Sequence, residues 1–229
     1  DTSDKDGSIS FRNVPFYEIY MPDAIAVLHK NNTPYLFTVN EGDAREYDTF
    51  KEAERIEDIT LDPAAFPNAA ALQDPAQLGR LNITKTLGDR NNDGKYESLY
   101  SFGARSFSVW NGLTGELLYD SKNNLEEAVN EAGYYDDGRS DDKGVEPEGV
   151  ALGEVGGKDI VFIGMERADA VAVYDVSNPT SPKLLQVLQS GDAPEGVLFI
   201  SAKDSPNKKS LLVVSSENDG VIKIYQPFE

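Results

Sequence analysis

One nine-residue segment, residues 89–97, combines residue types and spacing that suit metal binding. Side-chain oxygens fall at its first, third and fifth positions, and a glycine stands at the sixth. With a backbone carbonyl at the seventh position, this spacing follows the oxygen cage that Ca²⁺ prefers. The predicted ligands are Asp89, Asn91, Asp93, Lys95 through its carbonyl, and Glu97.

The context of this segment favours a β-hairpin over an EF-hand. Its twelfth position, where an EF-hand carries a bidentate glutamate, is Tyr100. Residues 83–87 and 96–102 on either side have the composition of strands. We therefore expect a Ca²⁺ loop between two strands, with Glu97 as the closing carboxylate. The alternative is a polar turn that binds nothing.

A second stretch, residues 136–148, is dense in charge. Seven ionisable residues lie between Asp136 and Glu146, and Glu148 follows them. Like charges at this density lower stability unless cations or solvent offset them. A solvated surface loop is the ordinary interpretation, and a site formed by carboxylates is the alternative.

A short pattern recurs three times along the chain. Proline, an acidic residue, a small residue and an aliphatic residue follow one another at 22–25, 147–150 and 194–197, and the last two copies begin 47 residues apart. A β-rich run after each copy reaches Glu41, Glu166 or Glu217. A period of about 40 to 50 residues with several short strands per unit is typical of β-propeller blades.

A propeller would bring the acidic residues of the repeats together, because the innermost strand of each blade lines a central channel. Converging carboxylates bind a metal or a cationic ligand, or act as acid and base, and arginines can hold phosphate. We therefore predict a channel site for a divalent cation. Its candidate residues are Asp23, Glu41, Asp43, Arg45, Arg139, Asp141, Asp142, Glu146, Glu148, Glu166, Arg167, Glu195 and Glu217.

The strand pattern leads to the same architecture. Runs at 24–28 and 35–39 predict a hairpin, and residues 150–189 contain four runs joined by turns, as one blade does. Residues 197–225 contain only three runs. An N-terminal run with Ile9, Phe11 and residues 14–20 is expected to supply the fourth strand, because an unpaired edge invites aggregation.

With an irregular unit from Leu81 to Tyr119, about four blades can be counted. We expect an all-β protein, one propeller domain or propeller fragment over residues 1–229. A fragment would have its exposed flanks covered by a missing segment or by a second copy of the chain.

Two insertions are expected between the strands, at about 48–78 and 122–144. The first contains prolines and alanine-rich stretches that suggest brief helical turns. In the second, Leu125, Ala128, Val129 and Ala132 follow helical spacing between Asn124 and Gly133, so one short helix is predicted.

Composition excludes several classes of function. The net charge of −19 opposes binding to nucleic acid, and the absence of cysteine excludes thiolate chemistry and disulfides. The only histidine, His29, cannot form a multi-histidine zinc centre. No run is apolar and long enough for a membrane span.

Several segments resemble one family, the bacterial choice-of-anchor I proteins. They are residues 40–47, 103–110, 137–149, 164–167 and 193–196. That family includes relatives of sea-urchin mesenchyme-specific cell-surface glycoprotein, and some members carry an alkaline-phosphatase label. The resemblance covers nearly the whole chain and implies an extracellular, periplasmic or cell-surface β-propeller. Because family members are generally longer, it also implies that this chain matches their C-terminal half.

Two functions follow from these observations. The first is a calcium-binding surface or secreted module that binds a ligand or partner. The alternative is a metal-dependent phosphoesterase, in which channel carboxylates hold Ca²⁺, Mg²⁺ or another divalent cation, and Arg45, Arg139 or Arg167 positions a phosphate-containing substrate.

Overall fold

The structure is a computed structural model and describes residues 1–228. It is an all-β protein with little helix, and it divides into two compact units, each built from separate segments of the chain. The first unit contains Asp1–Met21, Glu41–Ala104 and Asp136–Gly144, and the second contains Pro22–Asn40, Arg105–Tyr135 and Val145–Glu229. The predicted insertion at 48–78 thus belongs wholly to the first unit.

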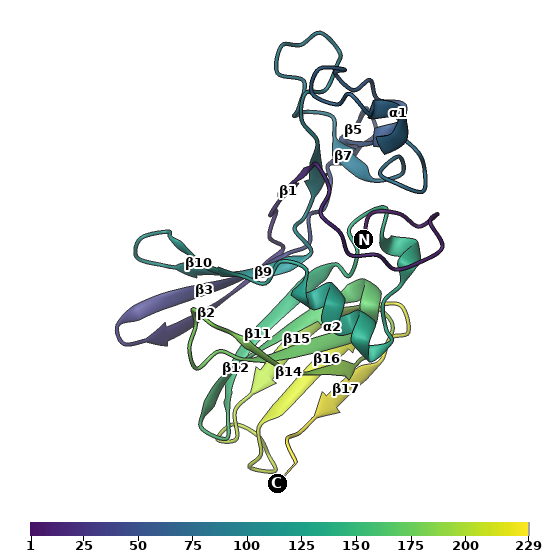
Figure 1. The fold of residues 1–229 in the computed structure, drawn as a ribbon. Helices are drawn as coiled ribbons and strands as arrows, with labels where there is room; N and C mark the ends of the chain where they lie inside the picture. Colours follow the sequence, from purple (N-terminus) through teal and green to yellow (C-terminus); the bar gives the residue numbers. More distant parts are fainter. Residues whose placement is uncertain (229) are drawn as a thin grey trace. The chain divides into compact units, whose positions relative to one another are not determined.

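Three antiparallel sheets form the second unit, and within each one the strands lie side by side in chain order (Figure 1). The first sheet contains β2 (Ala24–Lys30), β3 (Thr33–Asn40), β9 (Ser106–Asn111) and β10 (Leu117–Asp120). The second contains β11 (Pro147–Val155), β12 (Lys158–Met165), β13 (Ala170–Asp175) and β14 (Lys183–Gln189). The third contains β15 (Pro194–Ile200), β16 (Leu211–Ser216) and β17 (Ile222–Tyr225). The predicted hairpin, the four-stranded unit and the three-stranded last unit are confirmed.

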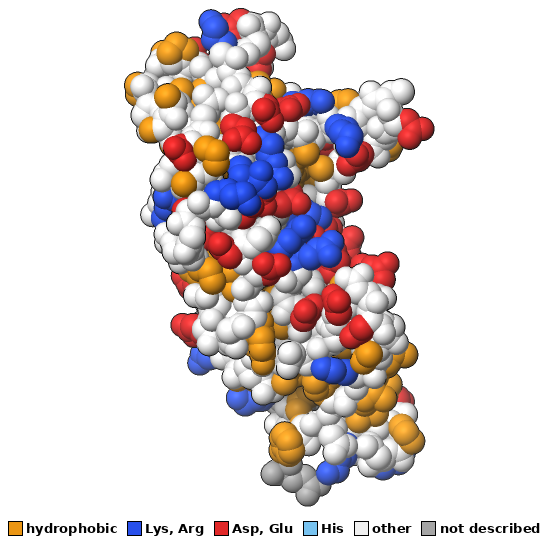
Figure 2. Space-filling view, turned by 90° about the vertical axis from the view of Figure 1, so that its right-hand side faces the viewer, with side chains coloured by type: hydrophobic (Ala, Val, Ile, Leu, Met, Phe, Trp, Pro, Cys, Tyr) orange, Lys and Arg blue, Asp and Glu red, His pale blue; other side chains and the backbone are white. Residues whose placement is uncertain are grey.

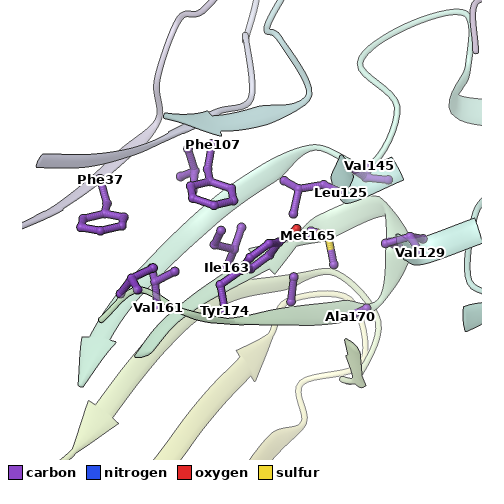
Figure 3. Packing of buried hydrophobic residues seen from close by; sticks show 14 of the residues in the cluster. Phe37, Phe107, Leu125, Val129, Val145, Val161, Ile163, Met165, Ala170 and Tyr174 are labelled. Carbon is purple, nitrogen blue, oxygen red and sulfur yellow. The ribbon is translucent and has the colours of Figure 1, made fainter. Parts of the chain in front are cut away.

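The first and second sheets share one hydrophobic core. Phe37 of β3 and Phe107 of β9 point toward Ile163 of β12 and Tyr174 of β13 (Figure 3). The rings of Phe107 and Tyr174 meet edge to face with their centroids 4.9 Å apart, an arrangement that aromatic pairs prefer. Alternate residues of each strand supply this core, as the period of two in a strand requires.

The second and third sheets share another core. Phe162 of β12 and Phe199 of β15 stack with centroids 5.7 Å apart, and Val173, Leu212 and Val214 are buried around them. The second sheet is therefore covered on both faces. This explains why β12 and β13 are apolar along nearly their whole length.

The repeated Pro-acid-small pattern begins the strand at which neighbouring sheets meet. β11 lies against both β2 and β15. A Cβ atom on Gly149 would lie only 2.6 Å from Val197 Cγ2, so the glycine of the repeat is what allows β11 and β15 to approach closely.

The predicted helix is also confirmed. Helix α2 runs over Asn124–Ala132 and ends at Gly133, whose φ of 79° is the left-handed conformation of a helix C-cap. Leu125 and Val129 are buried in the core of the first and second sheets. Glu126 pairs with Arg105 at 3.2 Å, and this ion pair attaches the helix to the start of β9.

The first unit contains a mixed sheet of four short strands and a two-stranded hairpin. The sheet runs in the order β1 (Tyr17–Ile19), β8 (Tyr100–Phe102), β7 (Asn82–Thr84) and β6 (Ala53–Arg55), and the hairpin pairs β4 (Glu46–Tyr47) with β5 (Phe50–Lys51). The first unit also contains one short helix, α1 (Ala69–Leu72), and two 3-10 turns, η1 (Ile56–Asp58) and η2 (Asp137–Arg139). A third 3-10 turn, η3 (Glu166–Ala168), lies in the second unit. With α2, these elements are the helical structure of residues 1–228. The brief helical turns expected in 48–78 are confirmed by α1 and η1.

Two predictions about strand pairing are wrong. The N-terminal run does not complete the third sheet, because β1 pairs in parallel with β8, where Tyr17 stacks on Tyr100.

The expected unit from Leu81 to Tyr119 is not one blade either. Its first half, β7 and β8, belongs to the first unit, and its second half, β9 and β10, completes the first sheet beside β3. Phe107 and Val109 alternate as Phe37 and Val39 do, so both pairs reach the same core.

In the part of the chain that the structure describes, the helices are too short or too polar to cross a lipid bilayer.

Candidate functional site

The predicted calcium loop connects β7 and β8, two antiparallel neighbours, so its location in a β-hairpin is confirmed. Gly88 opens the loop with a φ of 101°, and its carbonyl accepts hydrogen bonds from the amides of Glu97 at 2.9 Å and Ser98 at 3.3 Å. A Cβ on Gly88 would lie 2.1 Å from the Ser98 carbonyl oxygen. The two ends of the loop are therefore held together by backbone contacts that only glycine permits.

Side-chain oxygens shape the interior of the loop. Asp89 accepts hydrogen bonds from the amides of Asp93 at 3.1 Å and Gly94 at 2.9 Å, and Asn91 accepts one from Asp93 at 2.8 Å. Glu97 accepts one from the amide of Arg90 at 2.8 Å. Gly94 has a φ of 83°, the left-handed conformation expected at the sharp turn in the sixth position.

These contacts bring three of the predicted ligands together. Carboxylate oxygens of Asp89, Asp93 and Glu97 all lie within 4.8 Å of one another. Two oxygens on opposite sides of a Ca²⁺ ion are separated by about 4.8 Å, twice a typical Ca–O distance of about 2.4 Å. Three carboxylates this close together could each contribute an oxygen to one cation. Lys95 places its ammonium group 3.5 Å from Asp93, which partly offsets the negative charge.

A second carboxylate cluster lies in the second unit. Glu148 is the second residue of β11, Glu195 the second residue of β15, and Glu166 begins the turn η3 directly after β12. One carboxylate oxygen from each lies within 4.8 Å of the other two. Of the predicted channel residues, these three are brought together because the close approach of β11 and β15 places the acids of two repeats side by side.

Arg167 and Glu146 complete this cluster. Arg167 contacts Glu166 at 3.0 Å and Glu146 at 3.5 Å. Glu146 is 1% exposed and Glu166 is 5% exposed. Burial, together with the nearby Glu146 and Glu195, raises the pKa of Glu166, although a hydrogen bond with Glu148 and the charge of Arg167 act in the opposite direction. The arrangement can hold a proton between two glutamates or accept a cation.

The other two channel candidates of the second unit lie apart from these oxygens. Asp23 is exposed just before β2, where its amide donates to the Val39 carbonyl at 3.0 Å. Glu217 is exposed just after β16, and its amide donates to the Ala193 carbonyl at 2.8 Å. Neither belongs to a group of clustered metal-type ligands among residues 1–228.

The remaining channel candidates belong to the first unit, and ion pairs engage them there. Arg45 binds both carboxylate oxygens of Glu52, at 2.8 and 3.0 Å. This bidentate contact is the main reason why the pKa of Glu52 falls to about 2.

The acidic stretch makes further pairs in the first unit. Lys143 contacts Glu41 and Asp43, Asp141 contacts Arg55 and Arg80 at 2.8 Å each, and Asp142 contacts Arg139 at 3.4 Å. Much of the charge density in this stretch is therefore offset by basic side chains of the same unit.

One further acidic group was not predicted. Oxygens of Asp1, Asp6 and Asp137 lie within 4.8 Å of one another in the first unit. Burial raises the pKa of Asp137, and the Asp6 carboxylate adds to this effect. Asp137 is far from Asp1 and Asp6 in sequence, so no spacing pattern predicts this group.

Comparison with known proteins gives two matches. A curated relative, Gigasin-3a of Magallana gigas, is 30% identical over 189 residues, which is 68% of this chain. The aligned region spans 66% of the length of that relative. The model of the choice-of-anchor I domain matches residues 1–179, which is most of the chain. The protein therefore belongs to the choice-of-anchor I family.

Proposed function

We propose that this protein is a calcium-binding β-propeller module that acts at the cell surface or after secretion by binding a ligand or partner. Membership of an anchor-domain family suggests a surface or secreted protein. The second unit contains three successive antiparallel sheets, and the first strand of the second sheet, β11, contacts the first strands of the other two, β2 and β15. This arrangement supports the propeller architecture. The sheets would be consecutive blades, and the segment 41–104 would be an insertion between two strands of one blade.

The observation that carries the calcium assignment is the geometry of the loop. Asp89, Asp93 and Glu97 gather their oxygens around one point, at the positions that the sequence spacing predicts. The Asn91 side chain and the Lys95 carbonyl supply neutral oxygens in the same loop. Ca²⁺ accepts six to eight oxygens in flexible geometry, whereas Mg²⁺ demands a near-ideal octahedron, so this mixed set favours Ca²⁺.

Isothermal titration calorimetry tests the assignment. Titration of the whole chain with CaCl₂ is expected to give saturable heat with one binding event per loop, and MgCl₂ is expected to give a weaker response. Asp93→Ala should abolish the Ca²⁺ heat. Asp48→Ala, which changes an exposed aspartate in the β4–β5 turn of the same unit, is the matched control and should leave it unchanged. Equal heats from Asp93→Ala and the wild type would remove the loop as a calcium site.

The structure gives less support to the alternative, a phosphoesterase. Arg45, Arg139 and Arg167, the predicted phosphate ligands, each contact at least one carboxylate. A phosphate would have to compete with these partners, which lowers the gain from binding it. The Glu148, Glu166 and Glu195 cluster is the feature that favours the enzyme. Turnover of p-nitrophenyl phosphate with Ca²⁺, Mg²⁺ or Mn²⁺ that Glu148→Gln abolishes would reverse the ranking.

A further inference from the structure

A cavity of about 520 Å³ lies between the second and third sheets. Its lining comes from β11, β12 and β14 on one side, and from β15, β16, β17 and the residues after β17 on the other. All of these residues belong to the second unit. Sites for small molecules usually have volumes of about 300 to 1,000 Å³, so the cavity is large enough to hold one.

The way in which the two sheets meet explains the cavity. β15 lies directly against β11 and β12. The outer strands β14 and β17 are joined instead by two long side chains that reach across from β17. Lys223 donates a hydrogen bond to the Ser190 carbonyl at 2.7 Å, and the Tyr225 hydroxyl donates one to the Gln189 carbonyl at 2.6 Å. The sheets are therefore farther apart at their outer strands, and space remains between them.

The walls of the cavity are mostly aromatic and aliphatic. Phe162 and Phe199 stack on each other, and Tyr225 and Phe228 add two more rings. Burial raises the pKa of Tyr225, as apolar surroundings do. Hydrophobic side chains also gather over the lower part of the surface in Figure 2, the part that holds β15, β16 and β17 in Figure 1. Such walls suit a flat apolar molecule, because aromatic rings stack on flat partners.

The polar groups of the cavity are neutral. Among residues 1–228, no charged residue lines it, although charged residues make up 27% of the chain. Its polar lining residues are Gln186, Ser210 and Gln226, and the two glutamines are exposed, which places them at the mouth. An ion in the cavity would lose water without gaining a partner of opposite charge. An anion would also enter against the net charge of −19.

We propose that this cavity binds a neutral, flat and mostly apolar small molecule, with a hydrogen-bonding group of the ligand at the mouth beside Gln186 and Gln226. A side-chain amide both donates and accepts, so a hydroxyl, carbonyl or amide group of the ligand suits this position. The inference names the ligand class that the proposed binding role leaves open, and it rests on that role. It does not depend on the calcium loop, which lies in the first unit.

Two fluorescent probes that differ by one charged group test the inference. N-phenyl-1-naphthylamine is neutral and carries aromatic rings and a single N–H, and 1-anilinonaphthalene-8-sulfonate has the same rings with a sulfonate added. Titration of the whole chain, followed by probe emission, should show saturable 1:1 binding of the neutral probe. The sulfonated probe should bind at least about tenfold more weakly, because its charge would be buried without a cationic partner.

Two variants of β14 locate the binding. Gln186→Arg places a cation at the mouth, so it should strengthen binding of the sulfonated probe by about two- to fivefold and leave the neutral probe unchanged. Gln189→Arg, at an exposed residue of β14 outside the lining, is its control and should change neither. Leu188→Trp fills part of the cavity and should weaken the neutral probe by about tenfold. Leu185→Trp, at a 49% exposed residue outside the lining, should not.

Three results would overturn the inference. The first is that the neutral probe shows no saturable binding. The second is that both probes bind equally well and Gln186→Arg changes neither. The third is that Ile224→Lys, at a 64% exposed residue on the other face of β17 from Tyr225, abolishes binding of the neutral probe, which would place the probe on the outer surface. Calcium calorimetry on Gln186→Arg measures the loop separately, so failure of the cavity and failure of the calcium assignment are distinguishable.

Discussion

Replacing Gly149 by alanine tests the role of the repeat glycine directly. The backbone of Gly149 has no positive φ, so alanine adds no conformational strain. The added Cβ would lie 2.6 Å from Val197 Cγ2 and 2.8 Å from the Glu195 carbonyl oxygen. Carbon atoms in contact prefer about 3.5 to 4.0 Å, so the shortfall is roughly 1 Å. Because one of the two obstacles is backbone, a change of rotamer cannot relieve the clash.

The expected cost is at the upper end of the range for overpacking, about 2 to 3 kcal/mol in the free energy of unfolding. Val197→Ala alone should cost about 1 kcal/mol, since it removes two partly buried carbons at about 0.8 kcal/mol each when fully buried. In the double variant the contact with the valine methyl group is gone and the contact with the carbonyl remains. The double variant should therefore lose about 1 kcal/mol less than the sum of the single variants.

Urea denaturation followed by tryptophan fluorescence measures these values. Trp110 is the only tryptophan and lies on β9, so the signal reports on the second unit. Gly138→Ala, which lies in the first unit and is followed by circular dichroism, is the control for adding a methyl group to a glycine. Its nearest neighbour is the flexible Asp136 side chain at 3.1 Å, so it should change stability by less than about 0.5 kcal/mol. The reasoning fails if Gly149→Ala is as stable as the wild type, or if its cost is the same with and without Val197.

Two further predictions concern pH. The pKa of Glu52 falls to about 2, mainly through its hydrogen bond with Arg45, so the stability from this pair is present above pH 4.5 and is lost as the pH falls toward 2. Glu52→Gln should lower the free energy of unfolding at neutral pH by about 1 to 2 kcal/mol, because the exposure of Arg45 limits what the pair contributes. It should also make stability, measured by circular dichroism, depend less on pH between 4.5 and 2. The pKa of Glu166 is raised, chiefly by burial, so wild-type stability should decrease as the pH rises above 4.5. Glu166→Gln should remove this decrease and stabilise the second unit at neutral pH by Trp110 fluorescence, whereas Glu217→Gln, an exposed control, should not.

The elements with strong local signals could be predicted from the sequence. Helix α2 follows from apolar residues at helical spacing and a glycine that can adopt the left-handed conformation at its end. The second sheet follows from four apolar runs and tight turns. The loop at 89–97 follows from the oxygen positions, because the same residues that would bind the ion also form its internal hydrogen bonds.

Pairings between distant segments could not be predicted. β9 is separated from its neighbour β3 by residues 41–104, and nothing in its own sequence says that the insertion folds separately. For the same reason, the sequence could not show which of the predicted channel residues lie close together in the structure. Arg45 is close to Glu41 in sequence, but its position is decided by Glu52, a residue that belongs to no motif.

The acidic cluster of Glu148, Glu166 and Glu195 depends on the close approach of strands that Gly149 permits. Gly149 lets β11 and β15 come close, and this approach places Glu148 and Glu195 within reach of Glu166. Burial is the main cause of the raised pKa of Glu166, and the nearby Glu195 carboxylate adds to it, whereas the hydrogen bond with Glu148 lowers it. A variant that separates the two strands should let water reach Glu166 and move Glu195 away from it, while it damages the packing. The pKa of Glu166 should therefore move toward its ordinary value in Gly149→Ala, an effect that carboxyl NMR titration would detect and that a purely local clash at Val197 would not produce.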